Sequence, residues 1–181
     1  RAGLAYTLLK AWEAFRSAAA RPSSSALSGK VRRAMSLLEK DPSLRRTVNV
    51  NLAALMMEDG RLDEAESVLN EALELREGAA RSGVHSSLSI LYLKKDQPRD
   101  ALVHAMNSYE LQPASELTRL GRAQSLAVAA RASALLGDIP QSQGLAEKAL
   151  HIAEKVQGAD ALVRELAHLA GRPPAEAGQG V

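Results

Sequence analysis

The segment MMEDGRLDEAESVLNEALEL, residues 56–75, contains a glycine between two runs of apolar residues. Gly60 can adopt the positive φ that ends a helix, so the segment is predicted to contain a helix end, a tight turn and a second helix. In the second run, apolar residues recur every three or four positions on one helical face: Ala65, Leu69, Ala72 and Leu73. The small residues let two helices approach closely, and the leucines fill the gaps between them. The segment therefore predicts one half of a packed helical hairpin.

The same pattern recurs along the chain. The first copy is NLAALMMEDGRLDEAESVLNEALEL (51–75), the second is SLSILYLKKDQPRDALVHAMNSYELQP (87–113), and a weaker third is VAARASALLGDIPQSQGLAEKALHIAE (128–154). Ala65 and Ala101 occupy the same place, 36 residues apart. A period of this length is typical of helical-repeat arrays, in which each hairpin buries its apolar face against its neighbours.

Turn and cap residues divide each copy into two helices. Gly137 is predicted to end a helix in the same way as Gly60, and Asp138 to cap the helix that follows. Pro98 and Pro140 fit the first turn of a helix, where no backbone N–H is needed. Each copy therefore reads as an opening helix, a tight turn and a closing helix.

The residues at the key positions of these copies resemble tetratricopeptide repeats. That pattern has a small residue after an apolar one in the first helix, a glycine at the turn, alanines in the second helix and a proline at its exit. The matching residues are Leu52-Ala53, Gly60, Ala65, Ala72 and Leu73; then Leu88-Ser89, Tyr92, Ala101, Tyr109 and Pro113; then Ala129-Ala130, Gly137, Ala149 and Leu150. Asp96 replaces a turn glycine and Ser142 an alanine. The resemblance implies an all-α, right-handed solenoid of stacked antiparallel hairpins with capping helices at both ends.

The flanking segments extend this array into a predicted single domain over residues 1–171. Its expected parts are a degenerate N-terminal hairpin at 3–44 that KDPS (40–43) closes, repeats at 46–79, 82–115 and 123–156, a capping helix at 159–171, and a disordered tail at 172–181. The opening helix of the third repeat, within 115–136, is expected to be longer than usual. Because the sequence begins at Arg1 without methionine, we expect a trimmed or processed chain.

Composition argues against catalysis. The chain has 181 residues, is 46% hydrophobic and 24% charged, and contains no cysteine, which excludes disulfides and cysteine nucleophiles. It has no glycine-rich phosphate loop, HExxH or GxSxG motif. The four histidines are not spaced as metal ligands on one helical turn: His85, His104, His151 and His168. We therefore predict a protein that is not an enzyme and that has no cofactor or metal.

The charges are distributed unevenly. Residues 1–50 hold ten Lys and Arg against three Asp and Glu, whereas residues 51–112 hold six against eleven. A basic end can meet an acidic partner or nucleic acid, although such charges are more often a solvated helix face. No run reaches the roughly 18 apolar residues of a membrane span. A cytoplasmic location is weakly favoured, and the oligomeric state stays open.

A concave surface lined by the opening helices is the predicted partner-binding site, where a peptide or helix of a protein partner would bind. Helical phase assigns to it Val50, Asn51, Ala54, Met57 and Glu58 in the first repeat, Ser86, Ser87, Ile90 and Lys94 in the second, and Ala127, Val128, Arg131 and Leu135 in the third. Met57 and Ile90 are expected to face away from the core. Because Val50 and Ser86 are not basic, the carboxylate clamp of some members of the family is incomplete here.

Two other functions stay open. A helical-repeat array could bind RNA through the basic N-terminal segment, although the acidic centre, the varying period and the small number of repeats oppose this. The chain could also be a structural subunit of a larger assembly, joined through its convex face and a helix that carries Trp12 and Phe15.

Overall fold

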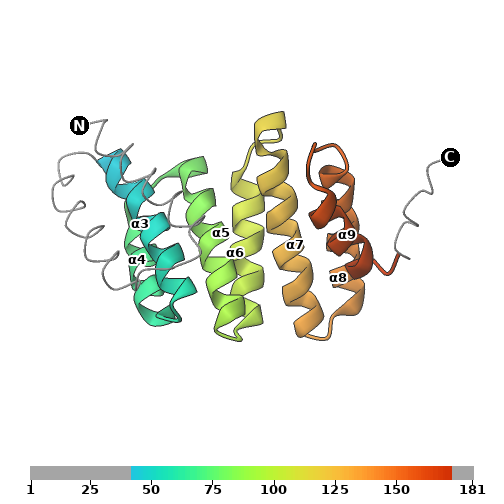
Figure 1. Cartoon of the computed structure of the whole chain (residues 1–181), viewed down its shortest axis with the longest axis horizontal. Helices are drawn as coiled ribbons and strands as arrows, with labels where there is room; N and C mark the ends of the chain where they lie inside the picture. Colours follow the sequence, from blue (N-terminus) through green and yellow to red (C-terminus); the bar gives the residue numbers. More distant parts are fainter. Residues whose placement is uncertain (1–41, 173–181) are drawn as a thin grey trace, which may run out of the picture. The chain divides into compact units, whose positions relative to one another are not determined.

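The structure, a computed structural model, describes residues 42–172, and every regular element in that range is helical (Figure 1). The elements are α3 (Pro42–Glu58), α4 (Leu62–Glu74), η1 (Gly78–Arg81), α5 (Ser82–Lys94), α6 (Pro98–Leu111), η2 (Glu116–Thr118), α7 (Arg119–Leu135), α8 (Ile139–Ala153) and α9 (Asp160–Leu169). The described residues fall into two compact units, one on each side of the boundary between Arg76 and Glu77.

In the first unit, α3 and α4 pack together as the predicted hairpin. Leu52 and Met56 of α3 are buried, as are Ala65, Leu69 and Ala72 of α4. The buried residues of α4 recur at four- and three-residue steps, so they form one stripe facing the other helix. Leu73, the fourth predicted member of that stripe, is only partly buried.

The second unit stacks two hairpins and a final helix. α5 packs against α6, α6 against α7, α7 against α8, and α8 against α9. This succession of antiparallel neighbours confirms the predicted all-α helical-repeat solenoid. The centre of the unit is α7, where small side chains allow helices to pack on several sides. Its buried residues are Ala123, Ser125, Leu126, Ala127, Val128, Ala129, Ala130, Ala132 and Ser133.

The three opening helices end in the same way. The second residue after each helix end has positive φ: Gly60 at +78°, Asp96 at +57° and Gly137 at +81°. The backbone N–H of the residue that follows then donates to a carbonyl five residues back, over 2.9, 2.8 and 3.0 Å respectively. This arrangement satisfies carbonyls that the helix end would otherwise leave unpaired. The turn at Asp96 keeps the geometry of the other two although its residue is not glycine.

Helix α9 ends with the same geometry. Gly171 has a φ of +70°, and Arg172 N donates to Ala167 O over 2.9 Å. The helix lies within the predicted capping segment 159–171 and packs against both α8 and α7. By its C-terminal geometry α9 is therefore similar to an opening helix.

The helix starts agree with the sequence prediction at two places. Asp138 caps α8 by accepting a hydrogen bond from Gln141 N over 3.0 Å, and Pro98 is at the start of α6. The segment 40–43 was expected to close a preceding hairpin. Its last two residues belong to α3, which begins at Pro42, and the preceding hairpin lies outside the described residues.

The rest of the predicted N-terminal hairpin, including Trp12 and Phe15, and the tail beyond Arg172 lie outside the described residues. The long opening helix predicted within 115–136 is present as α7, which begins at Arg119, before the predicted repeat start at residue 123. Between residues 42 and 172 no helix is both long and apolar enough to cross a lipid bilayer.

Candidate partner-binding surface

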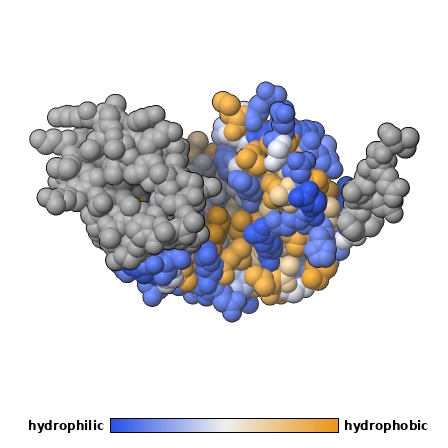
Figure 2. Space-filling model, viewed as in Figure 1, coloured by the Kyte–Doolittle hydropathy of each residue, from blue (hydrophilic) through white to orange (hydrophobic). Residues whose placement is uncertain are grey.

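The predicted site residues of the second unit lie on α5 and α7, which contact each other. Ile90 and Lys94 are exposed on α5, one helical turn apart, and Arg131 and Leu135 are exposed on α7 with the same spacing. Ser86 and Ser87 are half-buried. On the face of the molecule seen in Figure 2, apolar and hydrophilic residues are interspersed.

Two residues assigned to the same surface of α7 are not accessible. Ala127 is 2% and Val128 7% exposed, so the prediction that they line an open surface is wrong. Helix α7 contacts α5, α6, α8 and α9, and these neighbours cover most of its circumference. Helical phase identifies a direction on a helix but not how many neighbours surround it.

The remaining predicted residues lie on α3, in the first unit. Val50, Asn51 and Ala54 are half-buried and Glu58 is exposed. Met57 is only 8% exposed, so the prediction that its side chain faces away from the core is wrong. Met57 lies one helical turn after the buried Ala53, so the two side chains share a face of α3, and this face is buried.

Arg131 forms an ion pair with Glu165. Its guanidinium contacts the Glu165 carboxylate, which joins the exposed side of α7 to α9. Both side chains stay partly exposed, at 45% and 35%, so the pair is accessible to solvent. Arg131 is therefore half of an ion pair rather than an isolated positive charge.

A pair of histidines joins the two helices of the second repeat. His85 Nδ1 of α5 lies 2.9 Å from His104 Nδ1 of α6, and the ring of Tyr92 stacks on His104 at 5.3 Å between centroids. Burial, together with the smaller effects of the charges of His104 and Arg81, lowers the pKa of His85 to about 4. His85 is therefore neutral at physiological pH and its ring can pair with His104 as donor or acceptor.

This contact was not predicted from the sequence, because histidines were compared only within one helical turn. His85 and His104 are 19 residues apart and face each other across the hairpin. The sequence could have indicated this contact, because His85 is on the opening helix and His104 on the closing helix of the same repeat. Within the described ranges no three His, Asp or Glu side chains gather as metal ligands.

Three features define a TPR-like helical-repeat protein. The hairpins are stacked, the opening helices are followed by residues with positive φ, and buried alanines lie between the helices. No family model matches the sequence, and no curated protein matches it. The likeness to known proteins is instead one of structure.

Several crystal structures are similar to this chain. BtubC (BKLC) from P. vanneervenii is 20% identical with a TM-score of 0.63, and the match covers 81% of this chain and 63% of BtubC. Two structures of nearly identical TPR-like repeats, from a Podosopora anserina protein described as a kinesin light chain, are each 14% identical. Their TM-scores are 0.68 and 0.66; both matches cover 93% of this chain, and 85% and 86% of those chains. The chain thus spans less than two thirds of BtubC, and at these identities the likeness establishes the TPR-like fold.

Proposed function

We propose that this chain is a protein-interaction scaffold that binds a peptide or helix of a protein partner along its opening helices. TPR-like folds generally serve as non-enzymatic scaffolds for other proteins. In the first unit, α3 carries three other residues predicted for partner binding, Val50, Asn51 and Ala54.

The observation that carries the proposal is the exposure of Ile90 and Lys94 on α5 and of Leu135 on α7. Each closing helix packs against one side of its opening helix, which leaves Ile90, Lys94 and Leu135 accessible on the opening helices. Ile90 is 41% and Leu135 61% exposed. Apolar side chains flanked by cations are the kind of surface on which an amphipathic helix or an extended segment can bury area.

The hairpin of α5 and α6 offers a matched pair of variants for the test. Ile90 on the opening helix and Val103 on the closing helix are both exposed β-branched residues, at 41% and 57%. Ile90→Glu introduces a negative charge on α5, and Val103→Glu introduces the same charge on α6, the other helix of the hairpin. The two variants and the parent would be used to capture partners from a lysate, with mass spectrometry to identify and quantify them.

Proteins captured by the parent should be lost with Ile90→Glu and retained with Val103→Glu. Circular dichroism should give the same helicity for all three chains, since both side chains are exposed. Loss of the same partners with Val103→Glu alone would assign binding to the closing-helix side and would contradict the proposal.

A further inference from the structure

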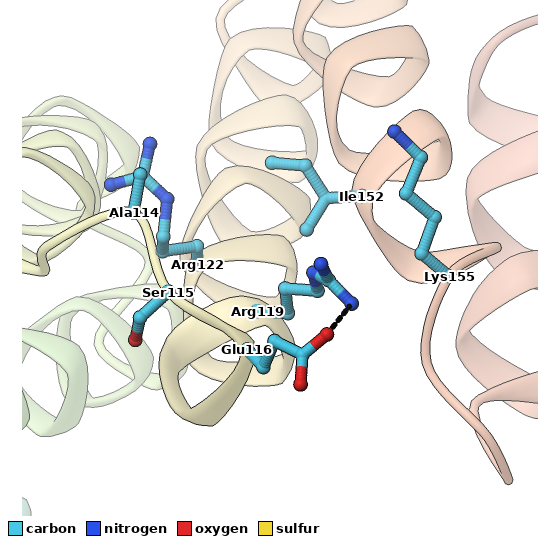
Figure 3. Close-up of a pocket in the computed structure, with 7 residues that line it drawn as sticks. All are labelled: Ala114, Ser115, Glu116, Arg119, Arg122, Ile152 and Lys155. Carbon is cyan, nitrogen blue, oxygen red and sulfur yellow. Dashed lines mark ion pairs between the residues drawn. The ribbon is translucent and has the colours of Figure 1, made fainter.

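A cavity of about 420 Å³ lies at the end of the α7–α8 hairpin opposite its turn. Figure 3 shows that its lining combines the connector between α6 and α7, the start of α7, and the end of α8. Ile152 in α8 supplies an apolar wall, and Lys155 lies just beyond the end of that helix. The volume is within the usual range for ligand pockets.

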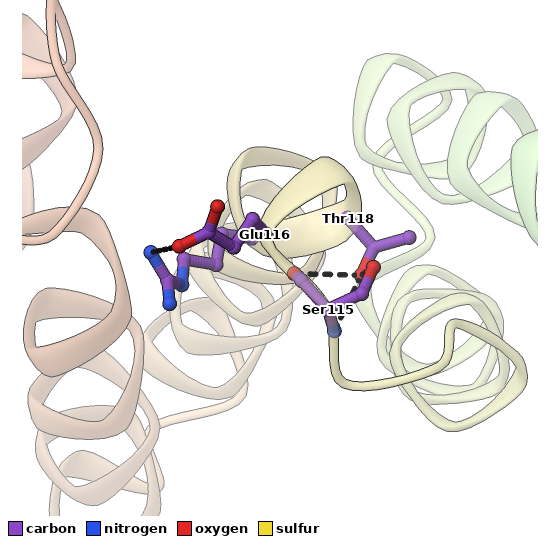
Figure 4. A network of polar contacts seen from close by, with 4 residues as sticks. Ser115, Glu116 and Thr118 are labelled. Carbon is purple, nitrogen blue, oxygen red and sulfur yellow. Dashed lines mark hydrogen bonds and ion pairs between the residues drawn. The ribbon is translucent and has the colours of Figure 1, made fainter.

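The connector that forms one wall is held by its own hydrogen bonds (Figure 4). The Ser115 backbone N–H donates to Thr118 Oγ1 over 3.2 Å, and the two hydroxyls are 3.0 Å apart. The Thr118 hydroxyl also contacts the Pro113 carbonyl. This reciprocal capping fixes the start of η2 and with it the position of Glu116 at the cavity.

Arg122, one of the three cationic residues that line the cavity, stabilises the connector between α6 and α7. Arg122 Nη1 donates to Tyr109 O over 3.2 Å and also to Gln112 O, at the C-terminal end of α6. Its guanidinium lies 4.1 Å from the centre of the Tyr109 ring. Arg122 therefore secures the connector, while its positive charge remains part of the lining.

The other two cations are held only by exposed groups. Arg119 pairs with Glu116 over 3.3 Å, and the Glu116 side chain is 84% exposed, so solvent screens this pair strongly. Lys155 Nζ is 2.9 Å from His151 Nε2, which leaves its positive charge uncompensated by that contact. Among the described residues that line the cavity, three cations thus stand against one carboxylate.

We propose that this cavity binds a carboxylate side chain within an acidic segment of a protein partner. A guanidinium can bind a carboxylate through two parallel N–H donors, and Arg119 can exchange its exposed partner for a ligand. The Ile152 wall suits the aliphatic part of a glutamate or a neighbouring apolar residue. The carboxylate of Glu116 disfavours a polyphosphate backbone, which needs a row of unopposed cations.

This proposal rests on the proposed function, since the ligand is a protein segment, but it uses a different surface. The cavity lies at the N-terminal end of α7, whereas Leu135 is at the C-terminal end of that helix. A partner that binds along the opening helices would therefore need to extend to the N-terminal end of α7 to place an acidic residue in the cavity.

The test measures fluorescence anisotropy of the full chain with a short labelled peptide in which glutamate alternates with leucine. The same peptide with glutamine in place of glutamate is the uncharged control. The cavity variant is Arg119→Glu with Lys155→Glu, and its matched control is Arg99→Glu with Lys148→Glu, two exposed cations that do not line the cavity. Both double variants change the net charge equally. Arg119→Gln with Lys155→Gln is the milder cavity variant, and circular dichroism checks the folding of each.

The acidic peptide should bind the parent and the matched control alike, and should bind the cavity variant at least about tenfold more weakly, a difference of about 1.4 kcal/mol. The glutamine peptide should bind weakly to all chains. Equal loss in both double variants would reduce the effect to net charge and would overturn the proposal, as would no binding to the parent at about 1 mM. Displacement of the peptide by inorganic phosphate at equal concentration would assign the cavity to small anions instead.

The same measurement separates the two proposals. Ile90→Glu should leave binding of the acidic peptide unchanged if the cavity is the site. If Ile90→Glu removes the binding and the cavity variant keeps it, the cavity proposal fails while the proposed function of the opening helices stands.

Discussion

His85 and His104 face each other with their Nδ1 atoms 2.9 Å apart, and this contact connects the opening and closing helices of one repeat. Only one of the two nitrogens can accept, so the other must carry the hydrogen. The buried position of His85 favours its neutral form, and a proton on His104 opposes a second one nearby. The hairpin therefore holds a titratable group in its core.

This contact predicts how stability depends on pH. The unfolded chain protonates His85 near the ordinary pKa of 6.5, whereas the folded chain does so only near 4. Between these values the unfolded state binds more protons, so stability is full above about pH 6.5 and falls as the pH drops to about 4. Urea unfolding across this range should show a shallower loss for His85→Gln than for the parent. His168→Gln, at an exposed position of α9, is the control and should follow the parent. Parallel curves for His85→Gln and the parent would contradict the assignment.

The turn residues predict opposite effects of two substitutions. Asp96 has a φ of +57°, a region that disfavours a side chain, so Asp96→Gly should stabilise by about 0.5–1 kcal/mol. Gly137 has a φ of +81°, so Gly137→Ala should destabilise by about 1 kcal/mol. Apart from its chain neighbours, no atom of the described part lies within 4 Å of a Cβ added at Gly137, so its cost should come from the backbone alone. Chemical denaturation measures both, and equal signs would refute the prediction.

Because α5 and α6 pack closely, we expect that a larger side chain at Ala101 destabilises the protein. Its side chain is 0% exposed, so Ala101→Trp should force the two helices apart at a cost of about 1–3 kcal/mol or more. Val103→Trp is the matched control two residues along the same helix, where 57% exposure leaves room for the ring. The control should shift stability by less than about 0.5 kcal/mol. If Ala101→Trp melts with the parent, the alignment of Ala101 with the close helix contact of the repeat is wrong.

The docking of α9 should depend on one leucine and little on its ion pair. Leu166 is 0% exposed, and Leu166→Ala should cost about 2–5 kcal/mol by leaving a cavity under the helix. Glu165→Gln breaks the contact with Arg131 between partly exposed groups, so its cost should stay below about 1 kcal/mol. Hydrogen exchange of the α9 amides should rise sharply in the first variant only. A similar rise in both would mean that the ion pair, not packing, holds the helix.

The helices and turns of the repeats were predictable from the sequence because their determinants are local. Gly60 and Gly137 mark helix ends through their own backbone freedom, and Asp138 caps a helix through a hydrogen bond to Gln141, three residues away. The spacing of Ala65, Leu69 and Ala72 likewise depends only on the helical period.

The accessible surface was less predictable because burial depends on neighbours that a helical period does not reveal. Met57 and Val128 were assigned to an open face, and both are buried. The cavity was missed for a similar reason, since Arg119 at the start of α7 and Lys155 after the end of α8 are far apart in the sequence and come close only when the hairpin folds.

The burial of α7 also restricts how this protein can diverge. Between Ala123 and Ser133 the helix exposes only Gln124 and Arg131, so nearly every substitution in that stretch changes a packing contact. Mutations that alter what the protein binds without loosening its centre are therefore confined to those two positions, the helix ends and the connectors. A library that saturates residues 123–133 of α7 should retain folded members almost only at Gln124 and Arg131, whereas variation in the connector around Glu116 and Leu117 should be broadly tolerated.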